Sequence, residues 1–220
     1  QAKQGLATAD NDRFLRQWYE ISIDKFCTTA KSCEETKTLP YKWYPYNKGG
    51  EYRKWFGNIT YVVNWEHDGF EIRNFKDSKG KLRSAVRNPT FYFKEGLTWS
   101  DVTSSTNAFR VNLSCNVYDV TGMTSFFNSH QELLFSLGTV NSNLANSLTK
   151  IINPTMHFQI GDFVKLPYLS KISLEKISSR VEECIRISKD DWNSYETTWD
   201  FKVNPLVKNS NLENSLETTY

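Results

Sequence analysis

The sequence predicts an α+β fold, in which an irregular antiparallel β-rich domain is closed by two or more helices. Short segments rich in β-branched and aromatic residues are separated by polar residues at the spacing typical of an antiparallel sheet. Towards the C-terminus, apolar residues recur at the helical period instead. The 220 residues are 39% hydrophobic and 15% aromatic, which is enough to bury a sizeable core.

The N-terminal part is expected to consist of turns and short elements. Asp10 or Asn11 is placed to cap a short helix through residues 13–16. Residues 19–24 alternate between apolar and polar side chains, which predicts a strand. Residues 27–39 are polar, which is typical of a loop or a short helix.

The middle of the chain carries the strongest strand signals. Residues 61–65 are the clearest strand, because valine and aromatic side chains dominate there. Asp68 and Gly69 predict a turn, which a strand or a helix over residues 70–75 would follow. Further strands are expected at residues 41–43, 108–113 and 117–120, a polar basic loop at residues 77–81, and an aromatic run at residues 91–93 that leads into residues 96–100.

Two amphipathic helices are predicted in the C-terminal half. The first covers residues 141–152 and ends before Pro154. The second covers residues 170–188, and its apolar stripe indicates core packing or a partner seam. The stripes consist of Leu144, Leu148, Ile151 and Ile152 in the first helix, and of Leu174, Ile177, Val181, Cys184 and Ile185 in the second.

These patterns divide the chain into three parts. Residues 1–168 form the main domain, and residues 169–208 form a helical connector with an aromatic segment. Residues 209–220 are rich in Asn, Ser and Glu and are expected to fray. The aromatic segment contains Trp192, Tyr195, Trp199 and Phe201.

The stretch from Tyr44 to Asn58 has the most unusual composition in the chain. It combines a Gly49-Gly50 pair, which permits a sharp turn or a close approach to a ligand, with three cations and five aromatic rings. Cations beside flat rings suit a polyanion with stackable bases. The alternative is an aromatic turn with solvated charges. Residues 51–56 are expected to form one helical turn within this stretch.

Charge is distributed unevenly although the net charge is only +2. Residues 41–100 hold eleven lysines and arginines against six acidic residues, so they carry about +5, whereas the rest of the chain is acidic. A basic middle region favours a local anionic partner, although solvated surface charge also produces such a pattern.

Sequence motifs for catalysis are missing. The chain contains no Gly-rich phosphate loop, no Gly-x-Ser-x-Gly, no His-Glu-x-x-His and no zinc quartet. Asn88-Pro89-Thr90-Phe91 approaches the tetrad of amino-group methyltransferases, but Thr90 replaces its second proline and no site for S-adenosylmethionine precedes it. We therefore expect no catalytic, cofactor-binding or metal-binding residues in this chain.

Location and processing follow from what the sequence lacks. No apolar run approaches the length of a membrane span, and no signal peptide is present. The scattered residues Cys27, Cys33, Cys115 and Cys184 indicate free thiols. We expect a cytoplasmic protein with no membrane partner. Because the chain starts at Gln1 rather than Met, we also expect it to be cut from a longer polypeptide.

Several blocks taken together resemble the large adenine-specific DNA methyltransferases of the PglX type, from BREX phage-defence systems, and the related type IIG restriction-modification enzymes. The blocks follow one another in the order found in that family, over nearly the whole chain. They are residues 5–14, residues 44–58 with 62–65, residues 92–100, residues 153–162 and residues 191–201. Ala9 stands where the family is expected to have glycine, so a positive φ at this position would be strained.

The resemblance implies the target-recognition half of such an enzyme. The parent enzyme would transfer a methyl group from S-adenosylmethionine to a flipped adenine in double-stranded DNA. The catalytic tetrad and the cofactor site of the family lie upstream of these blocks, in a methyltransferase domain of the same polypeptide. This chain alone is therefore expected to be inactive.

Candidate DNA-binding residues follow from the resemblance together with residue type. Cations would neutralise phosphates, and polar side chains would bond to base edges or phosphates. Tyr46, Trp55 and Trp99 would support the loop or stack on an extruded base, although core packing is favoured for Trp55 and Trp99. The cations are Lys42, Lys48, Arg53, Lys54, Arg83 and Arg87, and the polar candidates are Asn47, Arg53, Thr98 and Ser100.

Three alternatives remain open at this point. The chain could be a protein-interaction scaffold within a defence complex, without direct DNA binding. It could be a catalytic fragment such as a nuclease, for which the sequence offers no metal cluster. A carbohydrate-binding or RNA-binding aromatic module fits the composition alone, but the five blocks argue against it.

Overall fold

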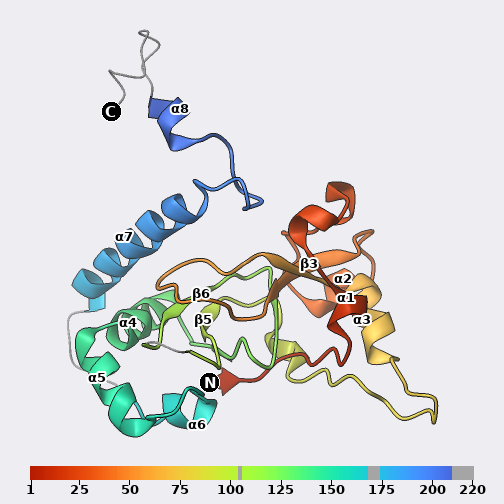
Figure 1. The fold of residues 1–220 in the computed structure, drawn as a ribbon, viewed down its shortest axis with the longest axis horizontal. Coiled ribbons are helices and arrows are strands. Elements are labelled where there is room, and N and C mark those ends of the chain that lie inside the picture. Colours follow the sequence, from red (N-terminus) through yellow and green to blue (C-terminus); the bar gives the residue numbers. More distant parts are fainter. Residues whose placement is uncertain (104–105, 168–173, 210–220) are drawn as a thin grey trace.

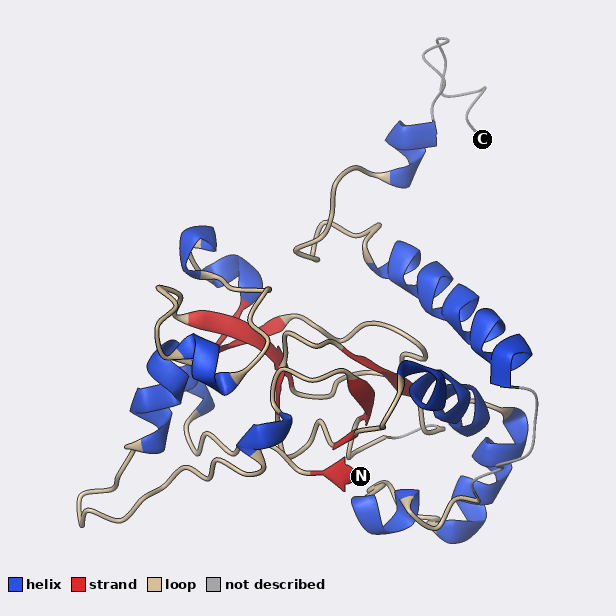
Figure 2. Ribbon diagram, turned by 180° about the vertical axis from the view of Figure 1, so that it is seen from behind, coloured by secondary structure: helices blue, strands red, loops and turns tan. Residues whose placement is uncertain are grey.

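The computed structural model describes residues 1–103, 106–167 and 174–209 (Figure 1). Two four-stranded sheets lie in the middle of the molecule, with α1, α2 and α3 at one end and α4 to α7 at the other (Figures 1 and 2). The predicted α+β class is confirmed. The strands are β1 Ala2–Lys3, β2 Leu15–Gln17, β3 Trp43–Asn47, β4 Tyr61–Asn64, β5 Gly96–Trp99, β6 Phe109–Asn112, β7 Val117–Tyr118 and β8 Thr124–Ser125.

The helices differ greatly in length. The longest is α7, and several of the others are single turns. The α-helices are α1 Asn11–Phe14, α2 Cys33–Thr36, α3 Glu66–Arg73, α4 His130–Val140, α5 Asn143–Ile152, α6 Ile160–Phe163, α7 Leu174–Trp192 and α8 Pro205–Asn209. The 3₁₀ turns are Trp18–Glu20, Ile23–Lys25 and Pro89–Phe91.

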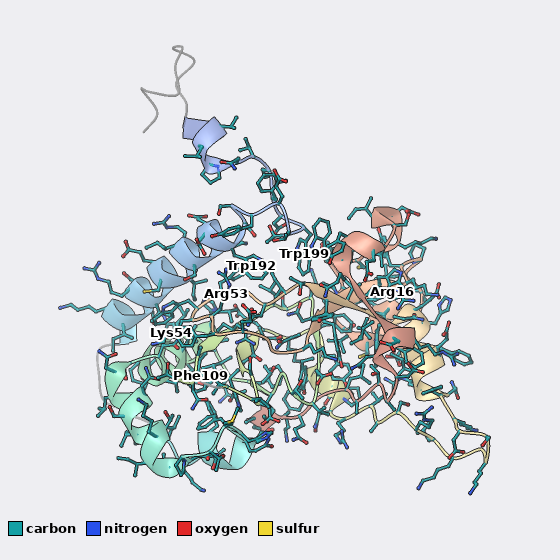
Figure 3. All side chains as sticks on the ribbon, viewed as in Figure 1. Arg16, Arg53, Lys54, Phe109, Trp192 and Trp199 are labelled. Atoms are coloured by element: carbon teal, nitrogen blue, oxygen red, sulfur yellow. The ribbon has the colours of Figure 1, made fainter. Side chains whose placement is uncertain are left out.

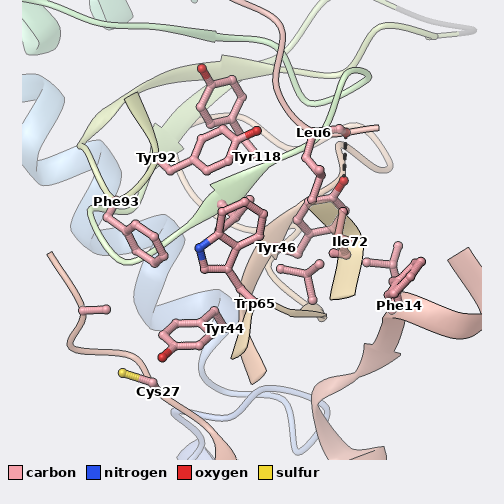
Figure 4. Close-up of a cluster of buried hydrophobic side chains, with 14 of the residues drawn as sticks. Leu6, Phe14, Cys27, Tyr44, Tyr46, Trp65, Ile72, Tyr92, Phe93 and Tyr118 are labelled. Carbon is pink, nitrogen blue, oxygen red and sulfur yellow. Dashed lines mark hydrogen bonds between the residues drawn. The ribbon is translucent and has the colours of Figure 1, made fainter. Parts of the chain in front are cut away.

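The first sheet has the order β2-β4-β3-β7 and is antiparallel except for the parallel pair β3 and β7. Pro45 is tolerated within β3 because β7 pairs only with Tyr46 and Asn47. An aromatic core covers this sheet (Figure 4). Its fully buried rings include Tyr44, Tyr46, Trp65, Tyr92 and Tyr118.

The second sheet has the order β1-β8-β5-β6 and is antiparallel throughout. It shares a core with α4 and α7, in which Trp99 is fully buried. The Trp99 ring stacks on Phe163 with centroids 4.5 Å apart, and its Nε1 donates to the carbonyl oxygen of Phe158 at 2.8 Å. The expectation that Trp99 is a core ring is confirmed.

The helix predicted at residues 141–152 forms as α5, capped by Ser142. Its buried residues are Ala145 and Thr149, whereas Leu144 and Ile151 of the apolar stripe are 66% and 78% exposed. The apolar stripe thus points away from the core that the structure describes.

The second predicted helix forms as α7 and continues to Trp192, while residues 170–173 lie outside the described residues. Val181 is buried, and Ile177 and Ile185 pack with it against the core under α4. The apolar seam is confirmed as core packing. The expected tail at residues 209–220 also lies outside the described residues, apart from Asn209, which ends α8.

Two local predictions are wrong. Residues 19–24 do not form a strand, because consecutive 3₁₀ turns occupy residues 18–20 and 23–25, and the strand precedes them as β2. Residues 51–56 form bends rather than a helical turn. In both places long-range pairing decides the backbone: Trp18 donates its backbone N–H to Thr60, and Trp55 donates to Phe109.

Other local predictions are confirmed. Asp10 caps α1 as predicted, by accepting from the N–H of Arg13, although the helix covers Asn11–Phe14 and residues 15–16 belong to strand β2 instead. Strand β4 forms where the strand signal is strongest. The Asp68-Gly69 turn appears as left-handed residues inside α3, which then continues as helix to Arg73. The four cysteines are free.

None of the described helices is both long and apolar enough to cross a membrane.

Candidate nucleic-acid interface

The stretch singled out in the sequence begins as strand β3 and continues as a crossover, residues 48–58, between the two halves of the molecule. The backbone of Trp55 pairs with β6, donating to Phe109 and accepting from Val111. Phe56 is buried against Trp192. The crossover therefore connects parts of the fold by backbone pairing and packing, in addition to presenting a surface.

Two predicted cations in the crossover are engaged by helices (Figure 3). Arg53 forms an ion pair with Asp191 of α7, Nη1 to Oδ2 3.1 Å, and its guanidinium lies 4.7 Å from the centre of the Trp192 ring. Lys54 Nζ donates to the carbonyl oxygen of Asn141 at 3.0 Å, at the C-terminus of α4. A cation at this position interacts favourably with the helix dipole.

Three predicted contact residues, Tyr46, Asn47 and Thr98, are no more than 2% exposed. The hydroxyl group of Tyr46 donates to Asp119 Oδ2 at 2.6 Å. It also lies 3.1 Å from the Leu6 carbonyl oxygen (Figure 4). Asn47 Nδ2 donates to Thr98 Oγ1 at 2.7 Å. In this conformation the three side chains are therefore unavailable to a duplex, which corrects their assignment as surface groups.

Ser100 is half-buried and holds the glycine turn in place. Its Oγ accepts from the N–H of Gly50 at 3.0 Å and donates to the carbonyl oxygen of Gly50 at 2.9 Å. It also accepts from Arg110 Nη2 at 3.2 Å. The two bonds to Gly50 hold the crossover against the second sheet, and the bond from Arg110 fixes the Ser100 side chain itself. Trp55, at φ +71°, is partly buried against the same core.

The remaining predicted cations face solvent at least in part. Lys42 and Lys48 are half-buried, with their ammonium groups 5.9 Å and 5.8 Å from the ring centres of Trp43 and Tyr61. Arg83 and Arg87 are exposed. None of these four forms an ion pair with a residue in the described ranges.

Arg83 and Arg87 belong to a projecting segment that we term the basic loop, residues 76–87 (the yellow loop beside α3 in Figure 1). It contains five cations and one acid, and the candidate residues named from the sequence include only two of the cations. The other three cations could have been found from the polar, basic composition of the loop, which is evident in the sequence. The cations are Lys76, Lys79, Lys81, Arg83 and Arg87.

Asp77 organises the tip of the basic loop. Its Oδ1 accepts from the backbone N–H groups of Lys79 and Lys81, both at 2.9 Å, as in an Asx-turn. Gly80 adopts φ +78° at the tip, with open space around it. The carboxylate is thus directed inward to backbone donors, while Lys79 and Lys81 remain exposed.

The base of the basic loop is fixed by packing and pairing. Arg83 and Arg13 both lie 5.0 Å from the centre of the Phe75 ring, and Phe75 in turn packs edge-on against buried Phe14. The backbone N–H of Arg83 donates to Phe75, and Ala85 pairs with Ala7. A projecting cationic tip on a fixed base presents charge without a large ordering cost.

The N-terminal turn that precedes this region is strained at the expected position. Ala9 has φ +61°, a left-handed conformation that suits glycine. The next residue, Asp10, caps α1, and Thr8 Oγ1 donates to Asn11 Oδ1 at 2.7 Å. A positive φ therefore does occur at the position where the family is expected to have glycine, and Ala9 carries the strain that this conformation imposes.

The described ranges hold no group of three or more His, Cys, Asp or Glu side chains positioned to bind a metal ion. Of the three histidines, His130 lies 2.9 Å from Glu95 and His157 lies 3.5 Å from Asp101, and both imidazole rings are largely exposed. The pKa of Cys33 is raised to about 12 and that of Cys115 to about 11, in each case mainly by burial. Neither thiol is therefore an activated nucleophile.

Comparison with known proteins places this chain within much longer relatives. It is 40% identical over 211 residues to adenine-specific methyltransferase PglX of Lacticaseibacillus casei (strain Zhang), covering 94% of this chain and 17% of the relative. It is 37% identical over 210 residues to adenine-specific methyltransferase BrxX of Escherichia coli O9:H4 (strain HS), covering 94% and 16%. No protein-family profile matches. The resemblance predicted from the sequence is confirmed, and the chain spans about one sixth of these curated relatives.

Proposed function

We propose that this chain, which is related over nearly its whole length to a segment of the PglX-type adenine-specific methyltransferases, recognises the DNA target of an N6-adenine methyltransferase. The parent protein would transfer a methyl group from S-adenosylmethionine to an adenine flipped out of the duplex. The cofactor would bind in the part of the parent that this chain does not cover.

The observation that carries the proposal is the basic loop. Its cations are exposed and free of ion pairs with the described residues, and the sole acid of the loop is turned to backbone donors. DNA is a dense line of negative charge, so such a projection gains affinity by releasing condensed counterions. Lys42 and Lys48 would add phosphate contacts on the same half of the molecule, since both adjoin β3.

A division of labour follows for the predicted domains. Residues 1–168 would form the recognition domain, and residues 169–208 would connect it to the parent through α7 and its aromatic segment. Base readout would then come from side chains that reach a groove after phosphate contacts have positioned the duplex. A role in phage defence or restriction-modification, within the cytoplasm, completes the proposal.

The test measures the binding of this chain to a labelled generic duplex. Fluorescence anisotropy reports the affinity at several salt concentrations. We expect affinity to fall steeply with salt, and Lys79→Gln with Lys81→Gln to lower the slope by about 0.9 for each phosphate that is no longer neutralised. Lys150→Gln, at an exposed position of α5, is the matched control. Equal slopes for the double variant and the wild type would reject the basic loop as the DNA-binding element.

One observation favours a second function, that of a protein-interaction scaffold. An apolar groove of about 450 Å³ lies between α4, α5 and α7, and Leu144 and Leu148 of α5 line it. Leu144 is 66% exposed. Leu144→Glu would abolish association with a partner chain and leave DNA binding unchanged if this face serves a partner, which pull-down and anisotropy measure separately.

A further inference from the structure

Arg110 is a buried cation on strand β6, at the edge of the second sheet that the crossover covers, and is 1% exposed. Its Nη2 donates to Ser100 Oγ, but its Nε and Nη1 atoms have no hydrogen-bond partner among the described residues. Burial lowers the pKa of Arg110 to about 10, so the side chain stays charged at neutral pH. A buried charge without a counter-charge is costly, which calls for a ligand.

A small pocket lies beside the guanidinium group. Its volume of about 10 Å³ is the space of one water-sized group. Ser100 and Gly50 form one wall, and their two mutual hydrogen bonds hold that wall in place. Arg110, Ser100, Gly50, Glu51, Tyr52, Thr103, Thr106, Asn107 and Ala108 line the pocket.

The chemistry of this lining selects an anionic oxygen. Arg110 supplies the charge, and exposed Tyr52 and half-buried Asn107 offer further polar groups among the lining residues. Glu51 is the acid that lines the pocket, and it is exposed to solvent, so it is not held against Arg110 by burial. Water would satisfy a donor of Arg110 but would not offset its charge, whereas a phosphate oxygen does both.

We propose that the pocket at Arg110 receives one oxygen of a phosphate group, and that in the function proposed above this phosphate belongs to the DNA backbone. The site rests on that function only for the source of the phosphate. This site is distinct from the basic loop. It relies on a single buried arginine, whereas the basic loop presents several exposed cations. It would thereby fix the register of one strand rather than supply general attraction.

The first arm of the test uses inorganic phosphate alone. Thermal unfolding of the chain is followed in increasing phosphate at constant ionic strength, for the wild type, Arg110→Met and the exposed control Arg180→Met. We expect phosphate to raise the Tm of the wild type and of Arg180→Met, and to leave the Tm of Arg110→Met unchanged, because only a ligand of the folded state stabilises it. Equal shifts in all three proteins, or no shift in the wild type, would overturn the phosphate site and assign the pocket to water.

Variants at the mouth of the pocket test it without disturbing the buried arginine. Asn107→Ala should weaken phosphate affinity severalfold, and Glu51→Gln should tighten it because a repelling carboxylate is removed. If Glu51→Gln instead lowers the Tm in the absence of phosphate, Glu51 itself is the partner of Arg110 and the proposal fails. These outcomes do not depend on whether Arg110→Met folds.

The second arm identifies the source of the phosphate by anisotropy on a labelled duplex. We expect Arg110→Met to weaken DNA binding at least tenfold and to lower the salt slope by about 0.9, the value for a single phosphate. A phosphate effect on Tm without a change in DNA affinity would retain the site but assign it to a free phosphate compound, which contradicts the DNA source. If the wild type binds no DNA at all, the proposed function fails. The thermal unfolding experiment then still tests whether the pocket binds phosphate.

Discussion

Arg53 and Asp191 are 138 positions apart in the chain and form an ion pair of 3.1 Å. The guanidinium group also lies 4.7 Å from the centre of the neighbouring Trp192 ring. Together with Phe56, which packs on Trp192, this ion pair ties the crossover to the end of α7. The crossover is thus attached to α7 through the side chains of both Arg53 and Phe56.

Replacing Arg53 should therefore cost stability rather than only charge. We expect Arg53→Ala to lower the free energy of unfolding by about 1–2 kcal/mol, because the substitution removes both a partly solvated ion pair and a cation–π interaction. Asp191→Asn should cost less, since the interaction with the ring remains. Urea unfolding measures both, with Arg180→Ala as the control, because its pair with Glu183 is largely exposed. Equal losses in the free energy of unfolding for Arg53→Ala and Arg180→Ala would show that Arg53 does not stabilise the contact between the crossover and α7.

Lys48 and Lys54 lie six positions apart but should respond differently to substitution by alanine. Lys54→Ala removes the donor to Asn141 at the end of α4 and should destabilise the chain by about 0.5–1.5 kcal/mol, with the salt dependence of DNA binding unchanged. Lys48→Ala removes only a distant contact with the Tyr61 ring, so it should cost less stability than Lys54→Ala, and it should lower the salt slope by about 0.9. Thermal melts and anisotropy on the same two proteins distinguish the roles, and a lower slope for Lys54→Ala would refute its assignment to the helix end.

The strained turn at Ala9 predicts a stabilising substitution. Glycine accepts φ +61° without the clash of a Cβ atom, so Ala9→Gly should raise the free energy of unfolding by about 0.5–1 kcal/mol. Ala85→Gly is the control, because Ala85 lies in a backbone bridge with Ala7 and the same change there should be destabilising. Destabilisation by both substitutions would show that the turn carries no strain.

Local signals in the sequence were sufficient where the cause of the structure is local. Asp10 caps α1, and Asp77 with Gly80 makes the tip of the basic loop, because side-chain-to-backbone bonds within a few residues determine both. The family motif drew attention to Ala9, but only the structure shows that its φ is positive. Exposed cations close to such turns were therefore within reach of sequence reasoning.

Long-range pairing explains what the sequence could not show. Tyr46 and Asn47 were assigned to a loop, but β7, some seventy residues further on, pairs with them and buries them. Arg110 looked like any solvated arginine, since nothing in Phe109-Arg110-Val111-Asn112 distinguishes a strand buried on both faces. The period of the apolar stripe of α5 was predicted correctly, but helical spacing does not reveal which face has a partner, and Leu144 and Ile151 are exposed.

Two buried tyrosine hydroxyl groups should behave in opposite ways. The Tyr46 hydroxyl group donates to Asp119, so Tyr46→Phe leaves a buried acceptor unpaired and should cost about 1–3 kcal/mol. The Tyr118 hydroxyl group has no partner among the described residues, so Tyr118→Phe should be neutral or stabilising. Chemical denaturation of both variants measures the difference. Similar destabilisation by both would mean that Tyr118 has a partner such as an ordered water molecule.

Alkaline pH should unfold the chain through the same core. Burial raises the pKa values of Tyr44, Tyr46, Tyr92 and Tyr118 above the ordinary value near 10, and at Tyr46 the charge of Asp119 adds to the effect. Because the folded pKa values are the higher ones, the stabilisation is fully present below about pH 10 and is lost as the pH rises through them.

The free energy of unfolding should begin to fall at a lower pH than the tyrosines alone predict, and with a smaller slope at first. Cys33 and Cys115, with pKa values of about 12 and about 11, ionise in the unfolded chain from about pH 9. Above about pH 10, Tyr46 alone should contribute a slope of about 1.4 kcal/mol per pH unit. Urea unfolding between pH 8 and 11, together with tyrosinate absorbance, measures both stages, and Tyr19→Phe is the control because Tyr19 is 63% exposed. Ionisation of all tyrosines near pH 10 in the folded chain would contradict the buried aromatic core, since a solvated hydroxyl group has no reason to retain its proton.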